Sequence, residues 1–350
     1  MKKIILLIFL FSNILCLSQN FNYQKNIEPN PFLELYNEDK PRLIKKEILL
    51  ETNKSTTNQI KDTLSINYYD KKGNVISKIL FDQLDQKGKT LIHCTFKDNL
   101  MIKRKVEIFL KNKTIFEEYK YNNQKNLIEY IEYTLRGTDT TSIRSKRRKY
   151  DENNNLIEAN LYAGNTMAKL LNVSSQKAIM NYDKQNRLVK HTHINSYSTH
   201  TPISKYYYTK NNLDSVIRFY EDPEKQSSYI KFRYDKFNNL VFKEEPNSSN
   251  TIINYYTYEY ENNKLIRAKH FKDTKLASIV DCSYHNGKLT RLEAKREKMN
   301  YYGPLYYFSF SSNLNVTIEY IRNKKGIIIQ ERKYFDGVLQ NTQFKEYEYY

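Results

Sequence analysis

Histidine, carboxylate and basic side chains are the groups in this sequence that could do chemistry. His191 and His193 are two residues apart in a strand-like stretch, so their side chains share one face, and His200 follows nearby. Two imidazoles and a third ligand could hold zinc. No cysteine lies close in the sequence, and no Asp or Glu lies at a spacing that would indicate a third metal ligand. We therefore interpret these histidines as solvated strand residues and expect neither a metal site nor a cofactor.

Carboxylates do not form a catalytic pair in this sequence. Glu117-Glu118 and Glu244-Glu245 are adjacent, and adjacent side chains of a strand point to opposite faces. They could not act together on one substrate as the two carboxylates of a glycosidase do. The sequence also lacks a G-x-S-x-G elbow, a phosphate loop and a dinucleotide fingerprint. We expect a protein that is not an enzyme and has no catalytic residues.

Positive charge is the main bulk signal. The chain has 57 Lys and Arg against 39 Asp and Glu, a net charge of +18. Such an excess favours anionic partners, and of these we expect an acidic glycan rather than nucleic acid. The interpretation that we prefer is that lysines on solvent-facing strand positions protect sheet edges from pairing and keep the protein soluble. The densest basic run gives the candidate anion contacts, placed between two hairpins in a loop or at a strand start: Arg144, Lys146, Arg147 and Arg148.

The elements that must position these groups are short and repeated. An aromatic residue, three to five turn-forming residues, and Leu or Val followed by another apolar residue recur with a period of about 26 residues. Looser copies start at Phe96, Phe310 and Tyr334. The tyrosines that anchor the repeats are Tyr69, Tyr121, Tyr150, Tyr182, Tyr208, Tyr234, Tyr260 and Tyr284.

One copy shows what a repeat is. Tyr256, Tyr258 and Tyr260 alternate with polar residues and so line one face of a strand. Asn262-Asn263 suits a tight turn, because Asn tolerates the left-handed backbone. Leu265-Ile266 then opens a return strand, in which Ala268 and His270 should continue the Ile266 face. The repeat is therefore a β-hairpin.

The repeats together predict an all-β protein of about 22 strands. Tandem hairpins should form an elongated, coiled antiparallel sheet or a β-solenoid-like shell, because open twisted sheets rarely exceed about ten strands without curling. We expect insertions between hairpins at 136–142, 163–173 and 196–201. The last strand, Phe344 to Tyr350, has no evident cap. Its edge should be covered by a loop or pair with another chain.

The chain start reads as an export signal. Residues 1–18 combine Lys2-Lys3 with an apolar stretch and a plausible cleavage site. Lipid attachment at Cys16 is a second reading, disfavoured by Leu15. Residues 19–41 are a polar linker or cap, and 42–350 form the repeat domain. We expect an exported protein, in the periplasm, on the outer surface or outside the cell, with no membrane span.

Cys94 and Cys282 would be the cysteines of the mature chain. Each precedes its repeat's aromatic residue by two positions and so should lie on the same side as Phe96 and Tyr284. In a linear stack the two repeats would be too far apart for a disulfide. We expect two thiols that are mostly buried and form no disulfide.

The repeated sequence motif resembles the YD repeat of the RHS family. Tyr69 to Ile76 (Tyr-Asp-Lys-Lys-Gly-Asn-Val-Ile) is the closest copy, followed by those at Tyr150, Tyr182 and Tyr234. The resemblance spans residues 60–350, although Asn mostly replaces the family glycine and several copies lack the Asp. It implies a β-rich repeat scaffold at the cell envelope. It does not imply toxin encapsulation, since neither a proteolytic core segment nor a variable toxin domain follows the last repeat.

Three hypotheses of function remain open at this stage. The first is a non-enzymatic scaffold at the cell surface that acts through protein or surface contacts. The second is a glycan- or polyanion-binding module that uses exposed tyrosines with Lys and Arg. The third is an accessory partner of an RHS-type toxin system. The oligomeric state stays undetermined.

Overall fold

The structure, a computed structural model, describes residues 44–53, 61–81, 88–164, 176–195, 201–220, 228–246, 253–296 and 315–349. These residues form 22 β-strands and one 3₁₀ turn at Phe109–Lys111. None of their helices is long and apolar enough to cross a membrane. The expectations for residues 1–41, His200, Phe310 and most of two insertions lie outside the described residues. The prediction of an all-β protein is confirmed.

The chain divides into two compact units, which we describe separately. The N-terminal unit comprises Lys40–Tyr206, Arg218–Ser227 and Thr342–Tyr350, and the C-terminal unit includes Tyr207–Ile217 and Ser228–Asn341. The strands of the N-terminal unit are β1 (Ile44–Asn53), β2 (Lys61–Tyr69), β3 (Val75–Phe81), β4 (Lys89–Lys97), β5 (Leu100–Ile108), β6 (Lys113–Tyr121), β7 (Leu127–Arg136), β8 (Asp139–Tyr150), β9 (Leu156–Gly164), β10 (Gln176–Tyr182), β11 (Leu188–Asn195) and most of β12 (Pro202–Thr209). Those of the C-terminal unit are most of β13 (Asn212–Tyr220), then β14 (Ser228–Tyr234), β15 (Leu240–Pro246), β16 (Ile253–Glu261), β17 (Lys264–Lys272), β18 (Lys275–His285), β19 (Lys288–Arg296), β20 (Val316–Arg322), β21 (Ile328–Phe335) and the start of β22 (Val338–Tyr349).

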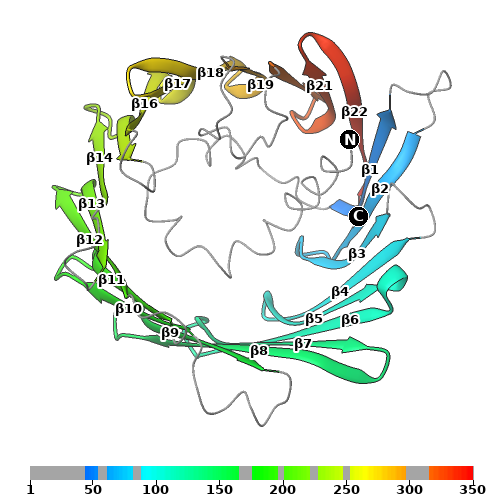
Figure 1. Cartoon of the computed structure of the whole chain (residues 1–350). Coiled ribbons are helices and arrows are strands. Elements are labelled where there is room, and N and C mark those ends of the chain that lie inside the picture. Colours follow the sequence, from blue (N-terminus) through cyan, green and yellow to red (C-terminus); the bar gives the residue numbers. More distant parts are fainter. Residues whose placement is uncertain are drawn as a thin grey trace. The chain divides into compact units, whose positions relative to one another are not determined.

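Strands that follow one another in sequence are neighbours in space. Each strand from β1 to β12 pairs antiparallel with the next, as Figure 1 shows strand by strand. The same holds from β14 to β21 in the C-terminal unit. The prediction of tandem hairpins is therefore confirmed. The expected insertion at 136–142 is wrong, because β7 and β8 meet there in a tight hairpin that pairs Arg136 with Asp139.

The two terminal strands pair with each other. Within the N-terminal unit, β1 hydrogen-bonds to β22 as well as to β2. Side chains join the same two strands, since Lys45 Nζ lies 2.7 Å from Glu348 Oε1 and Gln343 Nε2 donates to Glu51 Oε1 at 3.2 Å. The expectation of an elongated sheet whose last edge is covered by a loop or by a second chain is wrong. Strand β1 satisfies that edge because unpaired backbone groups favour any available strand partner.

Six turns share one hydrogen-bond pattern. In the first, Asp70 Oδ1 accepts the backbone N–H groups of Lys72 and Asn74 at 2.8 and 2.9 Å, and Oδ2 accepts the Asn74 amide. Gly73 takes the left-handed backbone at φ +85°. An Asx side chain that mimics a backbone acceptor explains why Asp or Asn follows the anchor. The same backbone pattern recurs in the turns starting at Asn122, Asp151, Asp183, Asp235 and Asn323.

The anchor tyrosines link neighbouring hairpins. Tyr182 Oη donates to the carbonyl oxygen of Leu156, in the preceding repeat, at 3.0 Å. Arg322 replaces tyrosine in one copy and donates to the carbonyl of Leu289 at 3.1 Å. The recurring bond explains the fixed phase of tyrosine. The other tyrosine bonds of this kind are Tyr121 to Met101, Tyr150 to Leu127, Tyr234 to Leu213 and Tyr284 to Leu265.

A β-bulge at most of the anchor tyrosines changes which residues share a face. Tyr260 pairs with Leu265 and Glu259 with Arg267, so Ile266 is the extra residue. Leu265 and Ala268 are therefore both buried, at 3% and 2% exposure. Simple alternation from Ala268 would put Leu265 on the opposite face, and the bulge brings the two residues together instead. The expectation that Ile266 shares the Ala268 face stays a prediction. Tyr256, Tyr258 and Tyr260 lie on one face of β16, as predicted.

The cysteines lie where alternation placed them. Neither Cys94 nor Cys282 forms a disulfide within the described residues. Cys282 is buried and shares its face with half-buried Tyr284, and Cys94 is half-buried like Phe96. Burial, with Asp281 nearby, raises the pKa of the Cys282 thiol to about 12, so the thiol stays protonated near neutral pH.

Candidate functional site

A row of charged side chains crosses the middle of the N-terminal unit's sheet. Register pairs Arg104 of β5 with Glu117 of β6, Glu117 with Glu132 of β7, and Glu132 with Arg144 of β8. Directly paired residues share a face, so all four side chains stand on the same side of the sheet. An apolar cluster of Leu80, Ile92 and Val106 lies beside the row. Four charges thus stand in line where a sheet face normally carries apolar residues.

The Arg104–Glu117 pair is the most enclosed part of the row. Arg104 Nη1 lies 2.9 and 3.1 Å from the two Glu117 oxygens. Their side chains are only 11% and 7% exposed. Tyr119 Oη also donates to Glu117 Oε2, at 2.5 Å. Such a pair is retained only when further hydrogen bonds satisfy the buried carboxylate, as they do here.

Two tyrosines and a lysine extend this network. Tyr130 Oη donates to Glu132 Oε2 at 2.8 Å, and its ring lies 5.3 Å from that of Tyr119. Lys146 Nζ lies over the Tyr130 ring, 5.9 Å from the centroid. Burial, with Arg148 nearby, lowers the pKa of Lys146 to about 7. We call Arg104, Glu117, Tyr119, Tyr130, Glu132 and Lys146 the β5–β8 network.

The chemistry of the β5–β8 network is mutual stabilisation. Burial and the Glu117 carboxylate raise the pKa of the Tyr119 hydroxyl, and burial with Glu117 and Glu132 raises that of Tyr130. Both phenols therefore stay protonated and act as hydrogen-bond donors at neutral pH. Donors and acceptors in the network are directed at one another rather than at a common point in space. The arrangement fixes four strands relative to each other.

The predicted anion contacts lie in the middle of strand β8, not in a loop. Arg144, Lys146 and Arg148 alternate on the face of the β5–β8 network. Arg147 points to the other face, where its Nε lies 3.1 Å from Glu129 Oε1. Its guanidinium also lies over the Tyr162 ring, 5.2 Å from the centroid. Strand alternation therefore divides these four residues between the two faces of the sheet.

The histidines share a face as expected. Register pairs Met180 with His191 and Ala178 with His193, on one side of β10 and β11. The expectation that both are solvated is wrong for His191, which is only 9% exposed because it lies on the buried face beside Met180. Burial, with His193 nearby, lowers the pKa of His191 to about 4. No group of three His, Cys, Asp or Glu side chains within the described ranges could hold a metal ion.

The adjacent carboxylates separate as predicted. Glu117 faces Arg104, whereas the Glu118 carboxylate lies 3.7 Å from Lys103 Nζ on the opposite side. Glu244 and Glu245 likewise approach different lysines, Lys231 and Lys243. The sequence reading missed the partners of Glu117, because Arg104 and Glu132 are its neighbours only through strand register. No local motif marks them.

Turns lie in a row at one end of the strands, which we call the turn edge. The hydrogen bonds that join neighbouring turns along the turn edge are called rungs. In four rungs an Asn Nδ2 donates to the Oδ1 of an Asn in the next turn, at 3.0–3.1 Å. In two others a lysine donates to a glycine carbonyl oxygen, Lys264 to Gly287 and Lys288 to Gly326. The Asn rungs are Asn126–Asn154, Asn155–Asn186, Asn212–Asn238 and Asn239–Asn263. The acceptor residue has a left-handed backbone in every rung.

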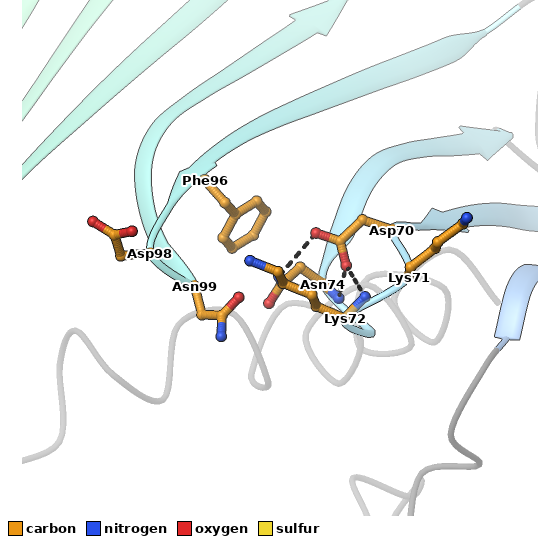
Figure 2. A pocket seen from close by; sticks show the side chains of 7 residues that line it. All are labelled: Asp70, Lys71, Lys72, Asn74, Phe96, Asp98 and Asn99. Carbon is orange, nitrogen blue, oxygen red and sulfur yellow. Dashed lines mark hydrogen bonds between the residues drawn. The ribbon is translucent and has the colours of Figure 1, made fainter.

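A surface pocket of about 250 Å³ lies between the first two turns of this edge (Figure 2). It is lined by Asp70, Lys71, Lys72, Asn74, Phe96, Asp98 and Asn99. The Asp70 carboxylate is occupied by its own turn, as the dashed lines of Figure 2 show. The pocket therefore offers the Phe96 ring, two amides, one carboxylate and two lysines to a ligand.

Comparisons with known proteins give only distant similarities. No protein-family model and no curated protein matches the chain. Among solved structures, a crystal structure of TcdB2-TccC3-Cdc42 is similar at 11% identity and a TM-score of 0.32 over 82% of this chain. The Tc holotoxin pore of Photorhabdus luminescens is similar at 11% identity and a TM-score of 0.30 over 89% of this chain. This chain spans a fifth of the length of each of those two, covering 20%.

A third similar structure is a porin-like protein from Bacteroides uniformis. The identity is 11% and the TM-score 0.33, and the match covers 87% of this chain and 98% of that one. The resemblance of the repeats to the RHS family stays a prediction from the repeated sequence motif.

Proposed function

We propose that this chain is an exported, non-enzymatic repeat scaffold that acts through protein or surface contacts at the cell envelope. The observation that supports it best is the double linkage between repeats. Each anchor bond ties a tyrosine to the preceding hairpin, and rungs tie successive turns along the edge. The recurring polar groups therefore form hydrogen bonds between hairpins, and such bonds make a repeat array rigid.

The charged residues support the same proposal. In the β5–β8 network, Arg104, Glu117 and Tyr119 bind one another. On the C-terminal unit, Arg267 lies 2.5 Å from Asp281 and Lys269 lies 2.7 Å from Glu259. These cross-strand ion pairs fix strand register, which a scaffold needs.

Polyanion binding is the second candidate, supported by the net charge of +18 and the exposed Arg144 and Arg147. The test is retention on immobilised heparin, eluted with a salt gradient. One variant changes Arg144, Lys146, Arg147 and Arg148 to Ala. The experiment is run at pH 5.5, below the pKa of Lys146, so that all four residues are charged. A control of equal charge changes four exposed lysines in turns, Lys111, Lys184, Lys236 and Lys324.

The scaffold proposal predicts that both variants elute earlier by the same amount, because only net charge has changed. Selective loss of retention in the β8 variant would instead establish a polyanion site there. Circular dichroism of both variants checks that the β-structure is kept, since Lys146 belongs to the β5–β8 network.

Export is tested separately. The full chain should leave the cytoplasm and become shorter at its N-terminus, whereas a chain lacking residues 2–18 should stay inside. Cell fractionation followed by mass spectrometry of the intact protein measures both. A full chain that stays cytoplasmic and uncleaved would overturn the proposed location.

A further inference from the structure

One rung along the turn edge is open. Asn74 follows the first turn, as Asn126, Asn155 and Asn239 follow theirs. Asn99 has the left-handed φ, +64°, of the acceptor residues. The amides of this pair match those of a closed Asn rung, yet no hydrogen bond joins them in the part of the chain that the structure describes. The 250 Å³ pocket lies at this place instead.

The open rung leaves hydrogen-bonding capacity at the pocket wall. Asn74 Nδ2 donates to Asp70 Oδ2 at 2.9 Å, which uses one of its two N–H bonds. The equivalent Asn155 and Asn239 use both, one within the turn and one across the rung. Asn99 and Asp98 are exposed and make no side-chain hydrogen bond within the described residues.

An aromatic ring completes the pocket. Phe96 lies between the two turns, with Asp98 and Asn99 on one side and Asn74 on the other (Figure 2). Phe96 is half-buried, so one part of its ring packs into the sheet and another faces the pocket. Drug-sized ligands occupy pockets of ~300–1,000 Å³. A pocket of 250 Å³ is suited to a ligand of one ring.

We propose that the open rung between Asn74 and Asn99 is a binding site for a single sugar ring. A hydroxyl both donates and accepts, so one hydroxyl can accept the second Asn74 N–H and donate to Asn99 Oδ1, restoring the rung through the ligand. A second hydroxyl donates to the Asp98 carboxylate, a charge-assisted bond. The C–H face of the sugar packs on the Phe96 ring. This site goes beyond the scaffold proposal and does not depend on it.

Saturation-transfer NMR on the full chain tests this site. The probes are methyl glucoside, methyl galactoside, N-acetylglucosamine and glucuronate, with cyclohexanol as a ring of similar size that carries a single hydroxyl. The expected result is transfer to the ring protons of at least one sugar, and none to cyclohexanol. Absence of transfer to every sugar would overturn the proposal, and so would equal transfer to cyclohexanol.

A matched pair of variants locates the binding. Asn99→Gly removes the amide while glycine keeps the left-handed turn, and Asn263→Gly makes the same change at a closed rung. Sugar affinity should fall about tenfold or more in Asn99→Gly and stay unchanged in Asn263→Gly. Phe96→Leu, which keeps an apolar side chain at this place, should weaken binding similarly. Affinity retained in both Asn99→Gly and Phe96→Leu would show that the sugar binds elsewhere and would overturn the proposed site.

Discussion

The two units carry different side chains on the same kind of hairpin, charged in one and apolar in the other. In the N-terminal unit, the row through the middle of β5–β8 reads Arg104, Glu117, Glu132 and Arg144. In the C-terminal unit, the row through β18–β20 reads Cys282, Leu292 and Ile318, exposed at 6%, 0% and 5%. The turns and anchor bonds are alike in both. The framework of the repeat therefore does not depend on what its face carries.

The anchor and turn hydrogen bonds are the same in both units, whereas the side chains on the sheet face vary. The anchor bond and the turn hydrogen bonds use backbone groups, which every hairpin has. The face residues meet only their neighbours across the strands, so a charged row and an apolar row are both stable when internally consistent.

The largest effect is expected from breaking the charged row. Glu117→Ala leaves the Arg104 guanidinium buried without its carboxylate, which should lower the free energy of unfolding by about 3–5 kcal/mol. Urea denaturation measures it. Glu259→Ala, a surface ion pair of the C-terminal unit, is the control and should cost under about 1 kcal/mol. Equal losses in the two variants would show that the charged row is not structural.

Cavity formation in the apolar row comes next. Leu292 is fully buried, so Leu292→Ala should lower the free energy of unfolding by about 2–5 kcal/mol. Leu110 is 54% exposed, and Leu110→Ala should leave the stability nearly unchanged. The same urea series compares the two. If Leu292→Ala were as mild as Leu110→Ala, the C-terminal row would not be a packed core.

Both units should lose stability in acid, because each buries a histidine, His191 or His270, whereas an alkaline effect of a buried lysine is expected in the N-terminal unit. In the C-terminal unit, burial, with Lys272 nearby, lowers the pKa of His270 to about 4 from 6.5. The unfolded chain then binds a proton more readily than the folded one, so stability is lost as pH falls from 6.5 to 4. In the N-terminal unit, the pKa of Lys146 is lowered to about 7 from 10.5, so stability should rise between pH 7 and 10.5.

Thermal melting across pH measures these two slopes. His270→Gln should reduce the acid slope to the part that His191 contributes and should keep the alkaline slope. Lys146→Met should flatten the alkaline slope and keep the acid one. His270 Nε2 lies 3.0 Å from Asn254 Oδ1, and Gln retains a hydrogen-bonding group there. A single variant that removed both slopes would contradict the assignment of each range to its own residue.

The smallest effect concerns what the two units share. Tyr182→Phe removes the anchor bond to the Leu156 carbonyl in the N-terminal unit, and Tyr284→Phe removes the bond to Leu265 in the C-terminal unit. Each should cost about 1 kcal/mol. Because the partner is a backbone carbonyl in both, the two losses should agree. A large difference between them would mean that the face residues do affect the framework.

The sequence was informative wherever a local rule acts. The phase of tyrosine before each turn and the Asn at left-handed positions predicted hairpins that the structure contains. Alternation placed Tyr256 and Tyr258 on one face correctly. It did not predict that Leu265 joins the Ala268 face, because a bulge adds one residue opposite the anchor and no local pattern marks it.

The β5–β8 network was beyond prediction for a related reason. Glu117 meets Arg104 across 13 residues and Glu132 across the next strand pair. Which carboxylate meets which cation depends on strand register, and a shift of one residue would turn Glu117 to the other face. The predicted basic run contributed only Lys146 to the network, with Arg144 and Arg148 on the same face.

What the sequence alone determined is the repeating unit: its length, its turn and the tyrosine that joins it to the previous copy. These follow from interactions between residues close in the chain, which the order of amino acids specifies directly. Only the tertiary structure decided that β1 pairs with β22, where Gln343 meets Glu51 across 292 residues, and which rows of side chains are charged or apolar. Contacts so distant in sequence depend on the summed geometry of every bulge and turn between them, and no local pattern records that sum.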